Sequence, residues 1–325
     1  MIGNLGRGLP AAVVALAAAV VLAACGSSSS TTSSTTSSTA STPSTTAASG
    51  PGVGKPAVVI GDKNFPEEFI LGALYAAALK AKGYKVTLKD NIGSSEIIYK
   101  ALTSGQIGMY PEYTGNISSV LAANSANLPS AAAAYSQGKA FLAKHGFDLL
   151  AMTPFSDSDV IITKPAFAKT HGLKSVGDLA KLGKSVTFAA EPENATRYAG
   201  LVGMKKAYNV VPSFKPLATS ALIYQALDSG QVQTANAFTT DPQLLKSGAY
   251  AQLADPKRIF GFQNVAPIVS KKVIAAEGPQ FASTLNAVSA LLTVGAIQQM
   301  NAAVILDKQS PATVAEQFLK ANHLA

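Results

Sequence analysis

The sequence predicts an α/β fold made of two similarly built lobes. Two observations support this. Short apolar runs alternate with helical patterns along residues 57–325, and the stretch Ser94–Gly115 returns in altered form as Thr219–Thr240. At an offset of 125 residues, these 22-residue stretches agree at nine positions. The alternative is a chance likeness of two amphipathic helices. We favour a structural repeat because the match runs past the helix into the following strand and loop.

Both copies of the repeat predict a helix that stops at a glycine and a strand that runs into an aromatic residue and a threonine. The first copy has Gly105, Ile107 at the start of the strand, and Tyr113-Thr114; the second has Gly230, Val232 and Phe238-Thr239. In open α/β sheets, ligands bind at the carboxyl ends of the strands. The repeat therefore predicts a ligand cleft between the lobes, bordered by these aromatic residues.

The amino terminus predicts export and attachment to a membrane. Arg7 precedes a short apolar run that ends in Leu22-Ala23-Ala24-Cys25-Gly26, which is typical of a secretory signal at residues 1–24. This ending resembles the bacterial lipobox, in which the cysteine is acylated; the alternative is an ordinary signal peptide with an incidental cysteine. Cys25 is the only cysteine, so no internal disulfide forms. We predict a lipid anchor at Cys25 on the outer face of the cytoplasmic membrane.

Residues 25–56 are nearly all Ser, Thr, Ala, Gly and Pro after the cysteine, and we predict a disordered tether. The folded part starts with a strand at 57–60 and a helix from Pro66, with Asn64 as N-cap and Glu67 completing a capping box. The further elements expected before the first crossing are a strand at 84–88, the first repeat copy, a helix at 131–145 and a strand at 148–152.

The chain is predicted to cross between lobes at residues 153–159 and again at 260–264. Between the crossings we expect strands at 160–163 and 186–190, a helix at 197–208 and the second repeat copy. After the return we expect a strand at 265–269 and helices at 281–292, 294–304 and 311–321. The predicted lobes are thus residues 57–155 plus 263–325 and residues 156–262, joined by two hinge strands.

The composition argues against several function classes. Removing residues 1–24 removes Arg7 and no acid, which lowers the formal net charge from +8 to +7, and the basic residues are scattered. Nucleic-acid binding would need a concentrated basic stripe with aromatics. The three histidines lie far apart without metal-ligand spacing, and no Gly-x-Ser-x-Gly or phosphate loop occurs. We therefore expect neither enzyme activity, a cofactor, a metal nor nucleic-acid binding, and we expect a monomer.

Two motifs resemble the substrate-binding proteins of ABC importers for quaternary amines such as glycine betaine, choline and carnitine. They are the run Val59–Glu68, which contains Lys63-Asn64-Phe65, and Tyr110-Pro111-Glu112-Tyr113-Thr114-Gly115. The likeness continues through Tyr224–Leu227 and Ala312–Leu319. The resemblance implies the type II periplasmic-binding-protein fold and delivery of a small osmoprotectant to a permease and ATPase by hinge closure.

The resemblance also implies a site. In that family, aromatic side chains enclose a methylated ammonium, which has no N–H to donate, and polar or basic groups hold the ligand carboxylate. By motif position Lys63, Asn116 and Arg197 are candidates for the carboxylate. Tyr113 keeps its place in the cage, whereas Phe238 and Phe262 stand where tyrosines are usual.

Asp159 stands where a fourth cage tyrosine is expected, and Asp157 precedes it in the same crossing. A carboxylate accepts hydrogen bonds, so amines with N–H groups or hydroxylated solutes would satisfy Asp159 better than N-methyl groups. Three functions thus remain open: import of a quaternary amine, import of a different small solute, and a surface lipoprotein that senses or adheres without transport.

The predicted ligand residues have structural alternatives. The aromatics Tyr113, Phe238 and Phe262 could be core residues, and Asp159 could bridge the lobes. Arg197 could pair with Glu191 or Glu193 instead of binding a ligand, and Lys63 could pair with Asp62.

Overall fold

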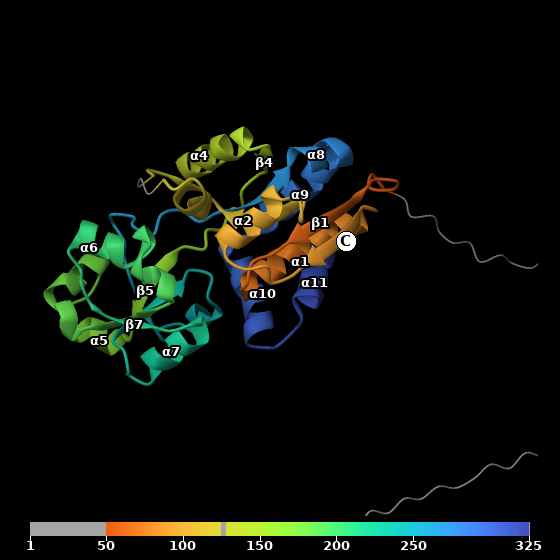
Figure 1. Ribbon diagram of the computed structural model, residues 1–325. Coiled ribbons are helices and arrows are strands. Elements are labelled where there is room, and N and C mark those ends of the chain that lie inside the picture. Colours follow the sequence, from red (N-terminus) through yellow and green to blue (C-terminus); the bar gives the residue numbers. More distant parts are fainter. Residues whose placement is uncertain (1–49, 125–127, 325) are drawn as a thin grey trace, which may run out of the picture. The chain divides into compact units, whose positions relative to one another are not determined.

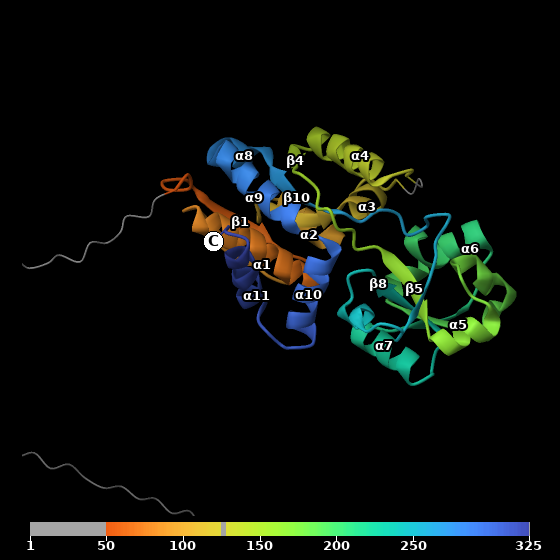
Figure 2. The ribbon, with the colours of Figure 1, turned by 180° about the vertical axis from the view of Figure 1, so that it is seen from behind.

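The computed structural model describes residues 50–124 and 128–324, and Figures 1 and 2 show them from two sides. Cys25, the signal sequence and most of the predicted tether lie outside the described residues. The folded part contains two mixed five-stranded sheets of the same plan. The expected α/β fold with two lobes is confirmed.

The first sheet has the order β2-β1-β3-β10-β4 and the second the order β7-β6-β8-β5-β9. The first consists of β1 (Ala57–Gly61), β2 (Lys85–Lys89), β3 (Met109–Tyr113), β4 (Phe147–Leu149) and β10 (Val265–Ser270). The second consists of β5 (Asp159–Thr163), β6 (Thr187–Ala190), β7 (Ser213–Pro216), β8 (Thr234–Phe238) and β9 (Ala251–Leu253). In each sheet three parallel strands are followed by an antiparallel strand that arrives from the other sheet.

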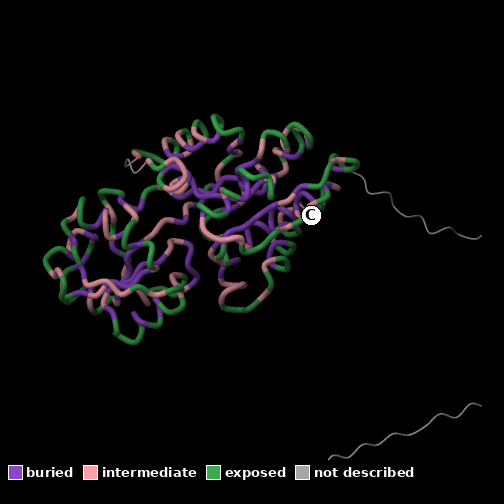
Figure 3. The backbone as a smooth tube through the Cα atoms, viewed as in Figure 1, coloured by how far each residue is buried: buried purple, intermediate pink, exposed green. Residues whose placement is uncertain are grey.

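Helices cover both sheets. Those of the first lobe are α1 (Pro66–Ala81), α2 (Ser95–Thr103), α3 (Thr114–Asn116), α4 (Ala131–Lys144), α8 (Lys271–Glu277), α9 (Pro279–Leu291), α10 (Val294–Ile305) and α11 (Pro311–Ala321). The second lobe has α5 (Pro165–His171), α6 (Gly203–Tyr208) and α7 (Ser220–Asp228). Helix α1 packs against α9, α10 and α11 (Figure 1). Figure 3 shows that the buried backbone lies in the interior and the exposed backbone mainly in the outer loops and helices; β3 is buried along its whole length, and so is most of α1.

The internal repeat corresponds to a repeated piece of structure. Helix α2 and strand β3 become α7 and β8 when 125 is added to each residue number. The antiparallel strands beside them match as well: Val265 of β10 lies opposite Tyr113, and Asp159 of β5 lies opposite Phe238. The predicted helix–strand repeat is therefore confirmed, and Asp159 holds in the second lobe the place that Val265 holds in the first.

The two crossings run side by side and are hydrogen bonded to each other. Ser156 and Asn264 form an isolated antiparallel bridge, and the Asp157 N–H donates to the Gln263 carbonyl at 3.1 Å. The Asn264 side-chain amide donates to the carbonyls of Thr153 and Phe155, both at 3.0 Å. The predicted crossings are confirmed, and their mutual bonding makes them one paired element.

The start of α1 differs from the prediction. The N-cap is Phe65, which makes no side-chain cap bond, and Pro66 is the first helical residue. The Asn64 capping box was wrong because the Glu67 carboxylate is bonded to Tyr113 and Asn301 instead. Tertiary hydrogen bonds here replace the local ones that the motif predicts.

Residues 50–56, which were predicted to belong to the tether, are part of the fold. Residues 50–56 include a turn, and the Gly52 N–H donates to the Lys82 carbonyl at 3.0 Å. A Cβ on Gly52 would collide with the backbone and ring of Tyr84, so only glycine fits this contact. The last residues before β1 are thus fixed against the end of α1.

The helix predicted at 197–208 is interrupted. Tyr198–Val202 forms a π-type turn with non-helical backbone at Ala199 and Gly200, and α6 starts at Gly203. A Cβ at Gly200 would meet the Asn194 carbonyl, so the chain folds back tightly there. Strands β7 and β9 were not predicted because polar residues interrupt them and neither forms the continuous apolar run that marked the other strands.

Among the described residues, no single helix combines the length and apolarity needed to cross a membrane. Helices α9 and α10 meet that criterion only when taken together, and they are bent by 89° where they join.

Candidate functional site

Lys63 lies between β1 and α1 with its ammonium buried among carboxylates and rings. Its Nζ is 2.6 Å from Glu112 Oε1 and 3.6 Å from Glu68 Oε1, and all three side chains are almost fully buried. Burial alone would lower the pKa of Lys63, but the charges of Glu112 and Glu68 raise it above its ordinary value. Lys63 is therefore a charged ammonium, paired with these two glutamates rather than with Asp62.

The same ammonium faces two aromatic rings. Its Nζ is 4.2 Å from the centre of the Tyr113 ring and 5.5 Å from that of Phe65. The two rings stack with centroids 6.0 Å apart. Within about 6 Å of a ring centre a cation is attracted by the π electrons. Phe65 was not predicted as a site residue, although it belongs to the Lys63-Asn64-Phe65 motif.

Tyr113 ends β3 and is held from behind by a buried acid. Its hydroxyl donates to Glu67 Oε1 at 2.8 Å, and the other oxygen, Oε2, accepts from the Asn301 amide at 2.8 Å. Burial raises the pKa of Glu67, and hydrogen bonds from Thr240, Asn301 and Tyr113 partly offset this. Glu67 and Asn301 were missed because they lie 46 and 188 residues from Tyr113 in the chain, and no local pattern joins them.

Asp159 and Phe238 face each other across the β5–β8 ladder, and both are half-buried. Asp159 Oδ1 accepts a hydrogen bond from Asn236 Nδ2 at 2.9 Å. Burial raises the pKa of Asp159 to about 7; the Asn236 bond and Arg197 pull it down, while Glu191 pushes it up. At neutral pH this carboxyl group is thus poised between its two protonation states.

Arg197 precedes the π-type turn and is half-exposed. Its guanidinium pairs with Glu96, in α2 of the first lobe, at 3.7 Å. In the described part of the chain it forms no ion pair with Glu191 or Glu193, the partners that its sequence neighbourhood suggests. The Glu96–Arg197 contact is an exposed link between the two lobes, and such pairs contribute little to stability.

Three predicted site residues lie in or beside the paired crossings: Asp157 in the first, Phe262 in the second, and Asn116 next to them after β3. The Asn116 N–H donates to Gln263 Oε1 at 3.2 Å, and the Thr114 hydroxyl donates to the Phe262 carbonyl at 3.1 Å. Asp157 accepts a 2.6 Å hydrogen bond from the Thr240 hydroxyl, and burial raises its pKa well above the ordinary value. These residues tie the end of β3 to both crossings.

The predicted site residues therefore fall into three groups. Lys63 and Tyr113 meet at the ends of β1 and β3, Asn116, Asp157 and Phe262 meet at the crossings, and Asp159 and Phe238 meet at the end of β8. Arg197 stands apart from these direct contacts, but it is near enough to Asp159 to lower its pKa. Their roles in ligand binding remain predictions.

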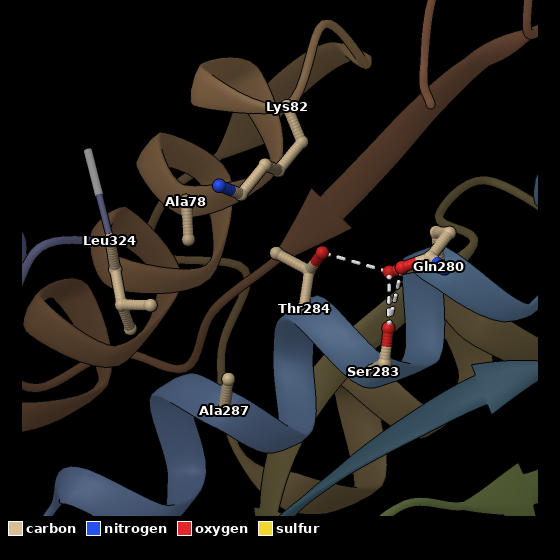
Figure 4. A pocket seen from close by; sticks show the side chains of 7 residues that line it. All are labelled: Ala78, Lys82, Gln280, Ser283, Thr284, Ala287 and Leu324. Atoms are coloured by element: carbon tan, nitrogen blue, oxygen red, sulfur yellow. Dashed lines mark hydrogen bonds between the residues drawn. The ribbon is translucent and has the colours of Figure 1, made fainter. Parts of the chain in front are cut away.

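Two small surface pockets lie elsewhere, on the outer side of α1. Figure 4 shows the first, where Ala78 and Lys82 at the end of α1 lie across from Thr284 and Ala287 of α9. The second lies between α1 and α11, beside Ala73 and Glu316. Neither contains a predicted ligand residue. Among residues 50–124 and 128–324, no cluster of three or more His, Cys, Asp or Glu side chains is arranged to hold a metal ion.

Two glycine betaine-binding proteins are similar to this chain over most of its length. The glycine-betaine-binding protein of Pseudomonas aeruginosa is 33% identical over 277 residues, which cover 82% of this chain and 88% of that protein. The glycine betaine-binding protein YehZ of Escherichia coli is 28% identical, covering 81% and 90%.

Solved structures share the fold. A crystal structure of a glycine betaine/carnitine/choline ABC transporter protein, 23% identical, superposes with a TM-score of 0.70 over 82% of this chain and 99% of that one. Ligand-free YehZ from E. coli is 26% identical and superposes with a TM-score of 0.64, over 83% of this chain and 99% of that one. Residues 56–321 match the family model described as the substrate binding domain of the ABC-type glycine betaine transport system. The chain belongs to this family of solute-binding domains, which are not enzymes.

Proposed function

We propose that the chain captures a small osmoprotectant of the glycine betaine, choline or carnitine type outside the cytoplasm and delivers it to an ABC permease and its ATPase. Family membership over residues 56–321 supports the transport role, and the glycine betaine-binding relatives support the class of solute. In this proposal the two lobes close on the solute by bending at the paired crossings.

The observation that carries the proposal is the cation over the Tyr113 ring. Lys63 Nζ lies 4.2 Å from the ring centre, with buried carboxylates around it. The end of β3 thus stabilises an ammonium by π electrons and negative charge, which are the means available for a methylated ammonium. Phe238 at the end of β8 and Phe262 at the crossing supply further ring faces for the same ligand group.

Arg197 is the proposed main contact for a ligand carboxylate. Lys63 is already paired with Glu112 and lies 3.6 Å from Glu68, so a ligand carboxylate would have to compete for it. Among the described residues, Arg197 has one weak, exposed ion-pair partner at 3.7 Å, which leaves donors for a forked contact with a carboxylate. Asn116, beside the crossings, is the proposed additional donor.

Substitution of Arg197 by alanine tests this assignment. We expect Arg197→Ala to weaken binding of glycine betaine and carnitine about tenfold or more, because a charge-assisted contact is lost. Choline has no carboxylate, so its affinity should stay within about twofold of the unmodified protein. Isothermal titration of the full chain in detergent measures both. Lys206→Ala, which removes an exposed charge on α6, is the matched control. Equal losses for betaine and choline would contradict the assignment of Arg197 to the ligand carboxylate.

A second candidate solute class follows from Asp159. Its carboxylate is half-buried beside Phe238 and accepts only one side-chain hydrogen bond in the described part of the chain. A ligand with N–H or hydroxyl donors would satisfy its remaining capacity. Asp159→Tyr should raise the affinity for glycine betaine if the position lines the cage. If primary amines or polyols bind more tightly than betaine to the unmodified protein, the second class is the correct one.

We also propose lobe bounds of 57–155 plus 263–325 for the first lobe and 156–262 for the second. A separate proposal is that Cys25 carries the lipid that holds the protein at the membrane. Cys25→Ser should release the protein into the medium of expressing cells. Retention of that variant in the membrane fraction would contradict the anchor.

A further inference from the structure

A buried asparagine in α10 contacts both halves of the proposed site. Asn301 is 3% exposed, and its Nδ2 donates to Glu67 Oε2 at 2.8 Å and to the Thr240 carbonyl at 3.0 Å. Glu67 belongs to the first lobe, and Thr240 follows β8 of the second. Both neighbours are acceptors, so only the NH₂ side of the amide can face them.

On the first-lobe side, the contact ends at an aromatic wall of the site. Glu67 receives the Asn301 amide on one oxygen and the Tyr113 hydroxyl on the other. The chain of contacts from Asn301 through Glu67 thus sets the position of the Tyr113 ring beneath the Lys63 ammonium.

On the second-lobe side, the contact holds the turn that follows Phe238. Thr240 lies two residues after Phe238, and its hydroxyl donates to Asp157 in the first crossing at 2.6 Å. The Phe238 N–H donates to the Asp241 carboxylate at 2.9 Å, which fixes the same turn. Asn301 therefore also helps to hold the turn that fixes the position of Phe238.

Gln298, one helical turn before Asn301, also donates to a backbone carbonyl of the second lobe. Its Nε2 donates to the Thr239 carbonyl at 2.9 Å. Residues three apart share a face of a helix, so α10 holds two consecutive carbonyls of the second lobe. Burying an amide is unfavourable unless it is hydrogen bonded. The NH₂ group of Asn301 is bonded twice, whereas its acceptor, Oδ1, has no partner among the described residues.

We infer that Asn301 is a positioning residue that couples the Tyr113 ring of the first lobe to the Thr239–Thr240 turn of the second, with Gln298 as its support. Asn301 does not contact the solute. It fixes the relative positions of the Tyr113 and Phe238 rings, which form two walls of the proposed site. The inference rests on the proposed function in so far as Tyr113 and Phe238 are those walls.

A double-mutant cycle tests the coupling. Asn301→Leu keeps the volume and removes both donors, and we expect glycine betaine affinity to fall about tenfold. In a Tyr113→Phe background, which lacks the hydroxyl that donates to Glu67, the same change should lower the affinity at least about threefold less. Purely additive effects on affinity would overturn the coupling between Asn301 and Tyr113. Gln299→Ala, on the exposed side of α10, should leave affinity unchanged.

A ligand-free measurement separates this inference from the proposed function. Spin labels at Lys80→Cys and Lys169→Cys in a Cys25→Ser background report the distance between the lobes. Asn301→Leu should broaden that distance distribution without any solute, and Gln298→Ala should broaden it less. If Asn301→Leu does not fold, Gln298→Ala decides. Unchanged distributions would overturn the inference, whereas absence of betaine and choline binding to the unmodified protein would overturn only the proposed function.

Discussion

At the scale of single residues, the proposed site would bind a cation differently in the two protonation states of Asp159. Its pKa of about 7 comes chiefly from burial, and the nearby charges of Glu191 and Arg197 act on it in opposite directions. A cation bound beside Asp159 stabilises the carboxylate, so binding releases its proton. Below the pKa that proton must first be displaced, and above it the carboxylate is already formed.

Choline affinity should therefore rise as pH increases through about 7 and level off above it, with a slope of up to tenfold per pH unit below. Titrations at constant ionic strength between pH 5.5 and 8.5 measure this. Asp159→Asn keeps the shape and removes the titrating group, so its profile should be nearly flat in the same range. If the asparagine variant keeps the slope, the titrating group is another one, with Asp241, whose pKa is raised to about 6, the next candidate.

The sequence predicted where the candidate residues lie in the fold, but not their hydrogen-bond partners. Tyr113 and Phe238 end β3 and β8 as the repeat predicts, and Asp159, which the family resemblance singled out, lies opposite Phe238. Asn301 and Asn236 were not predicted, because their hydrogen bonds join elements far apart in the chain. For Arg197 the neighbouring acids suggested a local pair, but the contact is with Glu96, about a hundred residues earlier. Spacing along a chain carries no information on such tertiary partners.

At the scale of elements, the repeat was the most reliable guide. Its two copies share helix and strand bounds at a constant offset, because the hydrophobic spacing and the terminal glycine act locally in both. The capping box at Asn64 failed for the opposite reason: Glu67 makes better-placed bonds with distant partners. Local rules predict an element well where no buried tertiary contact competes for the same side chain.

The break before α6 yields a test at this scale. Gly200→Ala should destabilise the fold by about 1–3 kcal/mol, because the new Cβ collides with the Asn194 carbonyl and backbone yields poorly. Gly295→Ala in α10 meets open space and should be neutral or stabilising by up to about 1 kcal/mol. Urea unfolding of both variants measures the difference. Equal stabilities would mean that the turn after Arg197 is not held as described.

At the scale of the whole molecule, two lobes of one topology are joined by paired crossings and by α10. The crossings bond to each other through Ser156 and Asn264, and α10 holds the second lobe through Gln298 and Asn301. Aromatic and acidic residues from both lobes gather around these connections. This arrangement favours a ligand that contacts both lobes at once, because such a ligand stabilises one relative position of the lobes.

A crystal structure of the protein with glycine betaine is the most direct test of the proposed binding site. We expect the trimethylammonium group against the rings of Tyr113 from the first lobe and Phe238 from the second, with the carboxylate at Arg197. A betaine bound to one lobe only, or seated in the pocket between α1 and α9 of Figure 4, would contradict it.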